Sequence, residues 1–234
     1  MAEDRLSAFE EAIGHLELTD GEIYDLMNRR GENFARLMAY YRCAMMEVET
    51  KFNVLNEEFS IRMERNPINS VKTRIKKFHS IREKLSRKGL DMTAENVEMN
   101  IYDVAGLRVI CPFTEDVYMV ADAFLGQDDV RLIKVKDYIK TPKENGYRSV
   151  HLIVEIPIFL EQEKKMMKVE IQLRTVAMDC WACLEHELRY KSDLELPDDM
   201  AEELNECARL SADIDRRMAH LKREIAQQNG DRNE

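Results

Sequence analysis

The chain has 234 residues, of which 44% are hydrophobic and 34% are charged, with only 8 Gly and 5 Pro. This composition provides a hydrophobic core beneath a highly charged surface, and it excludes a fibrous, collagen-like or low-complexity protein. The formal net charge of −10 argues against duplex DNA or an anionic membrane surface as the main partner.

The first 61 residues are predicted to form a helical extension. They begin with the acidic, amphipathic segment MAEDRLSAFEEA, which lacks the basic and apolar regions of a secretory signal and favours a cytoplasmic protein. No apolar run approaches the roughly 20 residues of a membrane span, so no membrane partner is expected. A short helix carries Leu6, Phe9, Ile13 and Leu16, and a long helix to about residue 60 carries a longer apolar stripe. The stripe comprises Leu37, Tyr41, Ala44 or Met45, Val48, Phe52, Leu55 and Phe59.

A basic segment follows between residues 62 and 88. It contains ten Lys or Arg residues and two Glu residues, which gives about +8 and leaves about −18 for the rest of the chain. Such a concentration in an acidic protein indicates an anion site of limited size, such as one for nucleotide phosphates. A solvated helix face explains the charges equally well.

The middle of the chain, residues 62–191, is predicted to be one domain that mixes strands and helices. Apolar runs at 107–113 and 152–160 predict strands covered by other elements, and 130–139 predicts another. A helix stripe ends near Gly126. Residues 169–174 alternate strictly, so Glu170, Gln172 and Arg174 share one face, which is either solvated or one wall of a polar site.

The last predicted unit, residues 192–234, is a C-terminal helical extension. Asp198 and Asp199 follow Pro197 and suit a helix N-terminus. The apolar stripe of this helix comprises Leu204, Ala208, Ser211, Ile214, Met218, Leu221 and Ile225. Both terminal helices present more apolar surface than a small core needs. We therefore expect them to pack on each other or on another subunit, as a homo-oligomer.

The five cysteines are an odd number in a chain without a secretory signal, which implies reduced thiols. Cys180 and Cys183 form a CxxC with His186 nearby. A zinc site needs a second pair of ligands and a thioredoxin motif needs a different strand context. The segment is therefore interpreted as a buried helix that uses small thiols for packing.

Two groups of residues carry the chemistry of a nucleotide site. The segment 141–151 is predicted to be a turn between strands, where Lys143, Arg148 and His151 can donate to phosphates and an exposed Tyr147 can stack on a base. Asp103 precedes the strand at 107–113, and Glu170 lies on the alternating strand. Two carboxylates from separate elements that face a basic segment are what a magnesium–nucleotide site requires.

Four motifs in this order resemble the synthetase domain of RelA/SpoT-type enzymes, and the small alarmone synthetases in particular, over about residues 62–191. They are RIK at 74–76 with Ser80, Ile81 and Lys84, DVAGLR at 103–108, YIKTPKENGYRSVH at 138–151 and VEIQLRTVAMDCWACLEH at 169–186. The resemblance implies an α+β fold, with a mixed β-sheet flanked by helices and related to the nucleotidyltransferases.

The activity that the resemblance implies is GTP pyrophosphokinase. Pyrophosphate passes from ATP to the ribose 3′-hydroxyl of GDP or GTP, which gives AMP and (p)ppGpp, with Mg²⁺ as cofactor. The long enzymes of this family also carry a hydrolase domain with a His-Asp metal motif. No His is followed directly by Asp here, so we expect synthesis only.

Each motif residue inherits an expected role from the resemblance. Arg74 and Arg108 match arginines that sandwich adenine, a use suited to a planar guanidinium. The other expected ATP ligands are Lys76, Lys84 and Arg87, which match groups that hold its phosphates. Asp103 and Glu170 match the metal-binding and catalytic carboxylates, and Glu170 also takes the proton from the 3′-hydroxyl. The acceptor side comprises Tyr147 for guanine, Lys143 and His151 for the acceptor phosphates, and Gln172 as a neighbouring polar contact.

The chain also departs from its relatives. Some small synthetases are tetramers whose product-binding cleft uses an aromatic residue and a glycine just before the first arginine, and Ser70 and Thr73 stand in these places here. These residues do not support product activation, whereas a homotetramer formed through the terminal helices is still expected. The alternatives are a catalytically weak guanine-nucleotide or single-stranded RNA binder and a purely structural helical oligomer. Retention of both Asp103 and Glu170 argues against mere binding.

Overall fold

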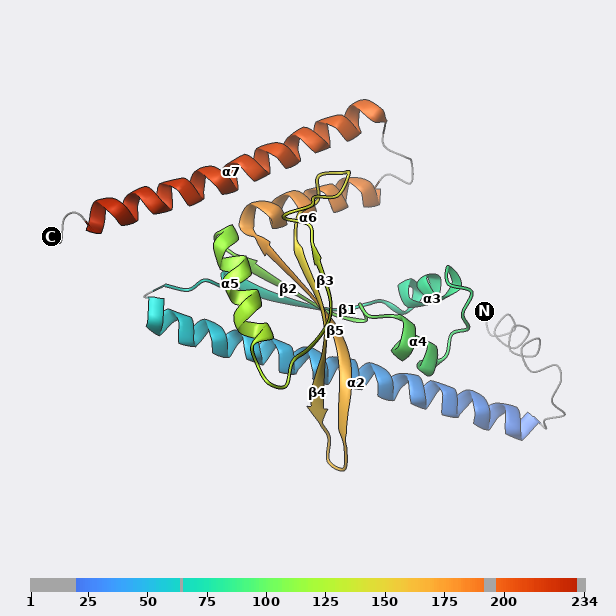
Figure 1. Ribbon diagram of the computed structural model, residues 1–234. Coiled ribbons are helices and arrows are strands. Elements are labelled where there is room, and N and C mark those ends of the chain that lie inside the picture. The colour runs from blue at the N-terminus through green and yellow to red at the C-terminus, as the bar shows by residue number, and fades with distance from the viewer. Residues whose placement is uncertain (1–19, 64, 192–196, 231–234) are drawn as a thin grey trace.

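Residues 20–63, 65–191 and 197–230 are described by the computed structural model, which is built around a five-stranded β-sheet (Figure 1). The helix expected around Leu6, Phe9, Ile13 and Leu16 lies outside the described residues. The strands lie in the spatial order β1 (Ser70–Ile75), β2 (Ala105–Cys111), β5 (Lys164–Thr175), β4 (Val150–Phe159) and β3 (Arg131–Asp137).

β2 and β5 are parallel, while the other neighbouring pairs are antiparallel. The predicted α+β fold with a mixed sheet flanked by helices is therefore confirmed. The apolar run at 107–113 was placed slightly too late, because β2 ends at Cys111 and Phe113 precedes the next helix, α5 (Thr114–Leu125). Gly126 ends that helix as expected.

One face of the sheet is covered by the long helix α2 (Asp20–Met63) together with α5 (Figure 1). The predicted stripe on α2 is buried, with Tyr41, Val48 and Phe52 at 0% exposure. The Phe52 ring stacks on Phe124 of α5 with 4.5 Å between the centroids. The expectation that this stripe packs on the C-terminal helix or on another subunit was wrong, because it belongs to the same hydrophobic core as the strands.

The opposite face of the sheet is polar and is bounded by helices at its two ends. α3 (Phe78–Ser86) and α4 (Ala94–Asn100) lie between β1 and β2 in the chain, at the end where β2 begins. α6 (Val176–Lys191) directly follows β5, at the end where the parallel strands β2 and β5 finish. The helices therefore leave the middle of this polar face, referred to below as the open face, accessible from outside.

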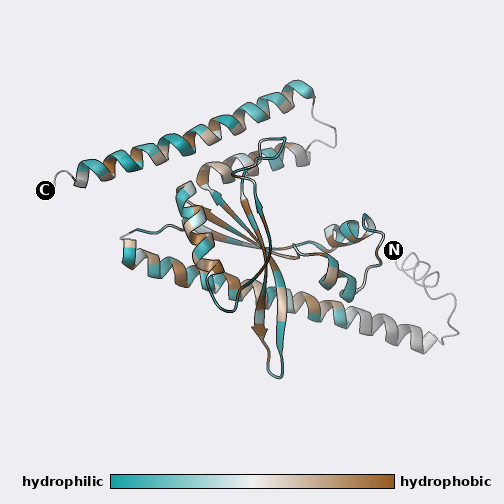
Figure 2. Ribbon diagram, in the orientation of Figure 1, coloured by the Kyte–Doolittle hydropathy of each residue, from teal (hydrophilic) through white to brown (hydrophobic). Residues whose placement is uncertain are grey.

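The C-terminal helix α7 (Asp198–Gly230) packs on α6. Ala208 is buried there, and the Trp181 indole N–H of α6 donates to the Leu204 carbonyl at 3.0 Å. Farther along α7, the predicted stripe is about half exposed in the described chain, from Leu221 at 48% to Ile225 at 58%. Figure 2 shows short hydrophobic stretches interspersed along an otherwise hydrophilic α7.

The interpretation of the CxxC segment was wrong about the thiols. Cys180 and Cys183 on α6 are exposed, and the residues that α6 buries between them are Trp181 and Ala182. Because consecutive helix positions point 100° apart, Trp181 and Ala182 can be buried while both thiols stay exposed. Cys183 Sγ accepts from Arg108 Nη1 of β2 at 3.6 Å.

Within residues 20–63, 65–191 and 197–230, none of the helices has an apolar stretch of the kind that crosses a membrane.

Candidate functional site

Two rows of side chains cross the open face, because residues directly opposite each other on neighbouring strands point to the same side of a sheet. One row runs through Arg74, Gly106, Glu170 and Ile153, and the next through Lys72, Arg108, Gln172 and His151. The strand register therefore brings together predicted site residues that are up to about a hundred positions apart in the chain.

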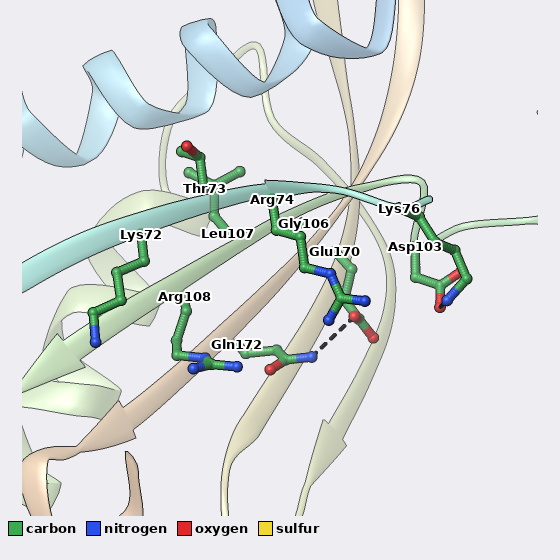
Figure 3. A pocket seen from close by; sticks show the side chains of 10 residues that line it. All are labelled: Lys72, Thr73, Arg74, Lys76, Asp103, Gly106, Leu107, Arg108, Glu170 and Gln172. Atoms are coloured by element: carbon green, nitrogen blue, oxygen red, sulfur yellow. Dashed lines mark hydrogen bonds and ion pairs between the residues drawn. The ribbon is translucent and has the colours of Figure 1, made fainter. Parts of the chain in front are cut away.

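A pocket of about 430 Å³ opens on this face. Its lining comprises Lys72, Thr73, Arg74, Lys76, Asp103, Gly106, Leu107, Arg108, Glu170 and Gln172 (Figure 3). The lining therefore includes both predicted carboxylates and both predicted adenine-binding arginines. Figure 3 shows the side chains of Arg74, Glu170 and Gln172 on the same side of the sheet, whereas Thr73 points to the other side. Thr73 thus contributes to the wall of this pocket without facing the open face.

Gly106 leaves the floor of the pocket free of side chains between Arg74 and Glu170. A Cβ built at this position would lie 3.6 Å from the Arg74 carbonyl oxygen, which is an ordinary contact. The backbone therefore does not require glycine here. A larger side chain would instead occupy the space between the arginine and the carboxylate.

Asp103 lies just before β2 and forms ion pairs with two lysines. Its Oδ2 atom is 3.0 Å from Lys76 Nζ and 2.9 Å from Lys84 Nζ, while its Oδ1 atom is buried and has no hydrogen-bond partner among the described residues. Burial raises the pKa of this carboxyl, but the hydrogen bonds and charges of Lys84 and Lys76 outweigh it and hold the pKa below its usual value. Asp103 is therefore an ionised carboxylate whose Oδ1 atom has no hydrogen-bond partner among the described residues.

Glu170 lies on β5 beside Gln172, whose amide donates to Oε2 of Glu170 at 3.0 Å. Nδ1 of His151 lies 3.4 Å from the other carboxylate oxygen. Burial raises the pKa of Glu170, the charge of Asp103 raises it further, and the hydrogen bonds from His151 and Gln172 bring it below its usual value. The two carboxylates are thus close enough to influence each other electrostatically.

This pair of carboxylates fits a divalent cation. Ionised carboxylate oxygens are the ligands that Mg²⁺ prefers, and Mg²⁺ is usually held by one or two of them together with water and phosphate oxygens. The unpartnered Oδ1 of Asp103 is the feature of the described chain that a cation would satisfy. Among the described residues there is no cluster of three or more metal-ligating side chains, so two carboxylates are what this site offers.

Tyr147 was expected to be exposed, but it is half-buried, because its hydroxyl group and its ring both have partners. Its Oη atom accepts from Arg174 Nη2 at 2.5 Å and lies 2.8 Å from His151 Nε2. Lys143 Nζ lies 4.7 Å from the ring centroid and the Arg174 guanidinium carbon lies 5.0 Å from it. The aromatic residue is therefore held in a defined orientation.

His151 links the tyrosine to the carboxylate. It is only 9% exposed and reaches Tyr147 with one ring nitrogen and Glu170 with the other. The loop residue Arg148, a candidate phosphate donor from the sequence, instead forms an ion pair with Asp215 of α7 at 3.2 Å.

Five of the predicted site residues do not line the pocket, namely Lys84, Arg87, Lys143, Tyr147 and His151. Arg87, at the end of α3, is exposed and lines a separate hollow with Arg82, Glu83 and Ser86. Lys143 is exposed and lies over the rings of Tyr138 and Tyr147, so the described chain does not direct it into the pocket.

Asp179 is a site residue to which the sequence analysis assigned no role. It lies in the first turn of α6, is 8% exposed, and is 3.3 Å from Lys72, 3.2 Å from Arg108 and 3.2 Å from Arg174. Its carboxylate therefore holds three positively charged side chains, from β1, β2 and β5, close to one another. Its position within the motif at 169–186 was visible in the sequence, but its partners were not.

Residues 73–195 match the family described as "Region found in RelA / SpoT proteins". The chain is 41% identical to GTP pyrophosphokinase YwaC of Bacillus subtilis, over 83% of this chain and 92% of that protein. It is 32% identical to GTP pyrophosphokinase YjbM of the same organism, over 83% of this chain and 90% of that protein.

Solved structures of small alarmone synthetases resemble most of this chain. The crystal structure of small alarmone synthetase 2 from B. subtilis superposes with a TM-score of 0.76 at 41% identity, covering 82% of this chain and 99% of that one. Small alarmone synthetase 1 from B. subtilis, solved bound to its product pppGpp, gives a TM-score of 0.75 at 32% identity, covering 82% of this chain and 97% of that one.

Proposed function

The chain belongs to the RelA/SpoT family, and we propose that the pocket on its open face is where ATP and the guanine nucleotide meet. The protein is a GTP pyrophosphokinase of the small alarmone synthetase type, which transfers pyrophosphate from ATP to GDP or GTP and makes (p)ppGpp. One observation carries the choice of site, namely that Asp103 and Glu170 line the same pocket as Arg74 and Arg108.

ATP binds, in this proposal, between β1 and the start of β2. Arg74 and Arg108 lie in adjacent rows on neighbouring strands, and their planar, weakly hydrated guanidinium groups are suited to stacking on both faces of adenine. Lys76, directly after β1, and Lys84 of α3 both approach Asp103, and they are available to pair with the phosphates that come with the nucleotide. Arg87 contributes from the exposed end of α3.

Asp103 and Glu170 hold a divalent cation, which we propose is Mg²⁺. When bound, the cation would neutralise charge on the ATP phosphates and act as a Lewis acid on them. Asp103 offers its unpartnered Oδ1 atom. Its two lysine partners keep the carboxylate ionised before the cation arrives.

The guanine nucleotide binds on the β4 side of the pocket, with its base on Tyr147. The Lys143 ammonium group now lies over this ring, so stacking requires it to move aside. Lys143 is exposed and flexible, so this displacement costs little, and it leaves the charge beside the acceptor phosphates. His151 and Gln172, in one cross-strand row with Arg108, supply further polar contacts to the acceptor.

Glu170 accepts the proton from the ribose 3′-hydroxyl in this scheme. Phosphoryl-type transfer leaves the protein mainly the tasks of aligning the nucleophile with the β-phosphate and stabilising spreading charge. Because the pKa of Glu170 is held below its usual value, the carboxylate is ionised at neutral pH and is ready to accept. Asp179 keeps Arg108 and Lys72 in place on the side of the pocket where ATP binds in this proposal.

The function is tested by incubating the protein with ATP, Mg²⁺ and either GDP or GTP. We expect equimolar AMP and the guanosine tetra- or pentaphosphate, resolved by anion-exchange chromatography. Binding of both nucleotides without AMP formation would instead support the binding-protein alternative. Omission of the guanine nucleotide is the control for simple ATP hydrolysis.

The Tyr147→Ala variant is expected to lose affinity for the acceptor. Base–aromatic stacking contributes about 1–3 kcal/mol per base, which corresponds to a roughly 5- to 150-fold higher KM for GDP or GTP. The KM for ATP should stay within about two-fold of wild type. Tyr147→Phe is the matched control, because it keeps the ring and removes only the hydroxyl contacts to Arg174 and His151. Equal increases for both nucleotides in the alanine variant would contradict the stacking role.

The protein also acts, we propose, as a cytoplasmic homo-oligomer, most simply a tetramer, that buries the exposed stripe of α7. Ile214, Met218, Leu221 and Ile225 are spaced by four, three and four residues along this helix, which is the pattern of a helix–helix seam, and each is about half exposed.

Met218→Glu is expected to lower the molar mass in solution, because it places a charge in the centre of that stripe. The measurement is size-exclusion chromatography with light scattering. Gln227→Glu, which adds the same charge to an exposed position off the stripe, should leave the mass unchanged. A monomeric wild-type protein would contradict the oligomer.

A further inference from the structure

The first half of α7 contacts the loop that carries Tyr147, although α7 lies outside the residues that match the family, 73–195. Gly146 has a φ of +82°, and a Cβ at this position would lie only 2.4 Å from the Cβ of Ala208. Loop and helix therefore approach so closely that a side chain on residue 146 has no room. The neighbouring Tyr147 packs against Ala208 as well as Trp181 and Ala182 of α6.

A largely buried ion pair fastens the same loop two residues farther on, just before β4. Arg148 Nη1 donates to Asp215 Oδ2 of α7 at 3.2 Å, and the Thr175 hydroxyl at the end of β5 donates to the same oxygen at 3.0 Å. Asp215 is 8% exposed and Thr175 is 0% exposed. One carboxylate oxygen therefore joins three separate elements, namely the loop, the strand that bears Glu170, and α7.

Stability alone does not account for Asp215. Burial raises the pKa of its carboxyl above the usual value in spite of the hydrogen bonds from Thr175 and Arg148. Buried ion pairs of this kind are often replaced by apolar side chains with no loss of stability, so their more distinctive contribution is to hold groups in one geometry. The geometry held here is that of Arg148, the residue directly after Tyr147.

The loop is also connected to the proposed catalytic carboxylate, Glu170, through His151. The Tyr147 hydroxyl lies 2.8 Å from His151, whose other nitrogen lies 3.4 Å from Glu170. A shift of the loop away from α7 would therefore displace the ring on which guanine stacks and loosen the contacts of the group that takes the proton.

We infer that Asp215 is a positioning residue for the guanine nucleotide, which acts by fastening Arg148 and so holding Tyr147 in its binding orientation. The inference rests on the proposed binding of the acceptor at Tyr147. It makes α7 part of the acceptor site, with the side of the helix that bears Ala208 and Asp215 facing the loop and another side carrying the exposed apolar stripe.

The test is the Asp215→Asn variant, which keeps an oxygen for Thr175 and removes the charge that holds Arg148. We expect the KM for GDP or GTP to rise about 5- to 20-fold, the range of a lost buried charge-assisted hydrogen bond that is only partly expressed in binding. The KM for ATP should stay within about two-fold, and kcat at saturating acceptor within about three-fold. Asp213→Asn is the matched control, because the partners of Asp213 within the described part of the chain are Arg216 and Arg217 of the same helix, and the substitution should change neither KM.

Arg148→Gln removes the same pair from the loop side and keeps the test decisive if Asp215→Asn does not fold, as judged by circular dichroism. It should raise the acceptor KM to the same extent, and the double variant should be no worse than either single one. An unchanged acceptor KM, or equal increases for both nucleotides, would overturn the inference. Absence of AMP formation by the wild-type protein would refute the proposed function instead, so the two failures are distinguishable.

Discussion

The Glu170→Gln enzyme is expected to lose nearly all turnover while it still binds both nucleotides. The amide keeps the size of the side chain and its place beside Gln172, but it can neither accept the proton from the 3′-hydroxyl nor contribute a charged ligand to the cation. General-base catalysis is worth about 10²–10⁴-fold, so kcat should fall by at least that factor. The measurement is AMP formation in a single turnover, with nucleotide affinities determined separately by calorimetry.

Glu161→Gln is the control for this variant, because it removes the same charge from the exposed turn between β4 and β5 and should be fully active. Because the pKa of Glu170 is held below its usual value, the carboxylate stays charged at the pH values where a glutamate ordinarily titrates. It loses its charge only in more acidic solution. The requirement for Glu170 should therefore hold throughout the neutral pH range. Wild-type kcat at pH 7 in the Glu170→Gln enzyme would refute the assignment of the base.

The Asp103→Asn enzyme is expected to respond much more weakly to Mg²⁺ than the wild-type enzyme. Neutralising Asp103 removes the carboxylate whose Oδ1 atom is buried without a partner among the described residues, and the cation contributes several kcal/mol to stabilising the transition state. A loss of about 3 kcal/mol corresponds to a roughly 10²-fold lower kcat/KM. A titration of activity against Mg²⁺ should show a higher midpoint and a lower plateau.

The affinity of the Asp103→Asn enzyme for metal-free ATP is expected to change in the opposite direction, which makes the prediction for this variant specific. Lys76 and Lys84 lose their carboxylate partner in this variant, so both are freer to bind phosphates, and ATP without a cation should bind at least as tightly as to wild type. Asp129→Asn breaks an equivalent pair with Lys51, 2.7 Å apart and outside the pocket, and should leave the Mg²⁺ titration unchanged. An unaltered midpoint in Asp103→Asn would exclude Asp103 as a ligand.

Periodicity predicted the secondary structure well because it depends on residues that are close in the chain. The alternation at 169–174 placed Glu170 and Gln172 on one face of a strand, and the structure confirms it, with Val169, Ile171 and Leu173 at 0% exposure on the other. The stripe on α2 was equally visible. Periodicity does not say what covers an apolar stripe, which is why α2 was expected on another helix and lies on the sheet instead.

The same limit explains the misread thiols and the unforeseen carboxylates. A CxxC spacing fixes the angle between two helix positions but not which side of the helix is buried, and here Trp181 and Ala182 took the buried side. Asp179 and Asp215 are ordinary acidic residues of helices when viewed in sequence. Their roles arise from partners such as Lys72 and Arg148, which lie 107 and 67 residues away in the chain.

The amino-acid sequence by itself determined the family, the candidate residues for both nucleotides and most of the strands and helices, although β1, α3 and α4 were not assigned. Motifs and periodicities are local properties of the chain. Only the tertiary structure decided that Asp103 and Glu170 share one pocket, that His151 joins Tyr147 to Glu170, and that α7 contacts the loop carrying Tyr147 and Arg148. These contacts depend on strand register and helix packing, which are set by the burial of the whole core and by no single segment.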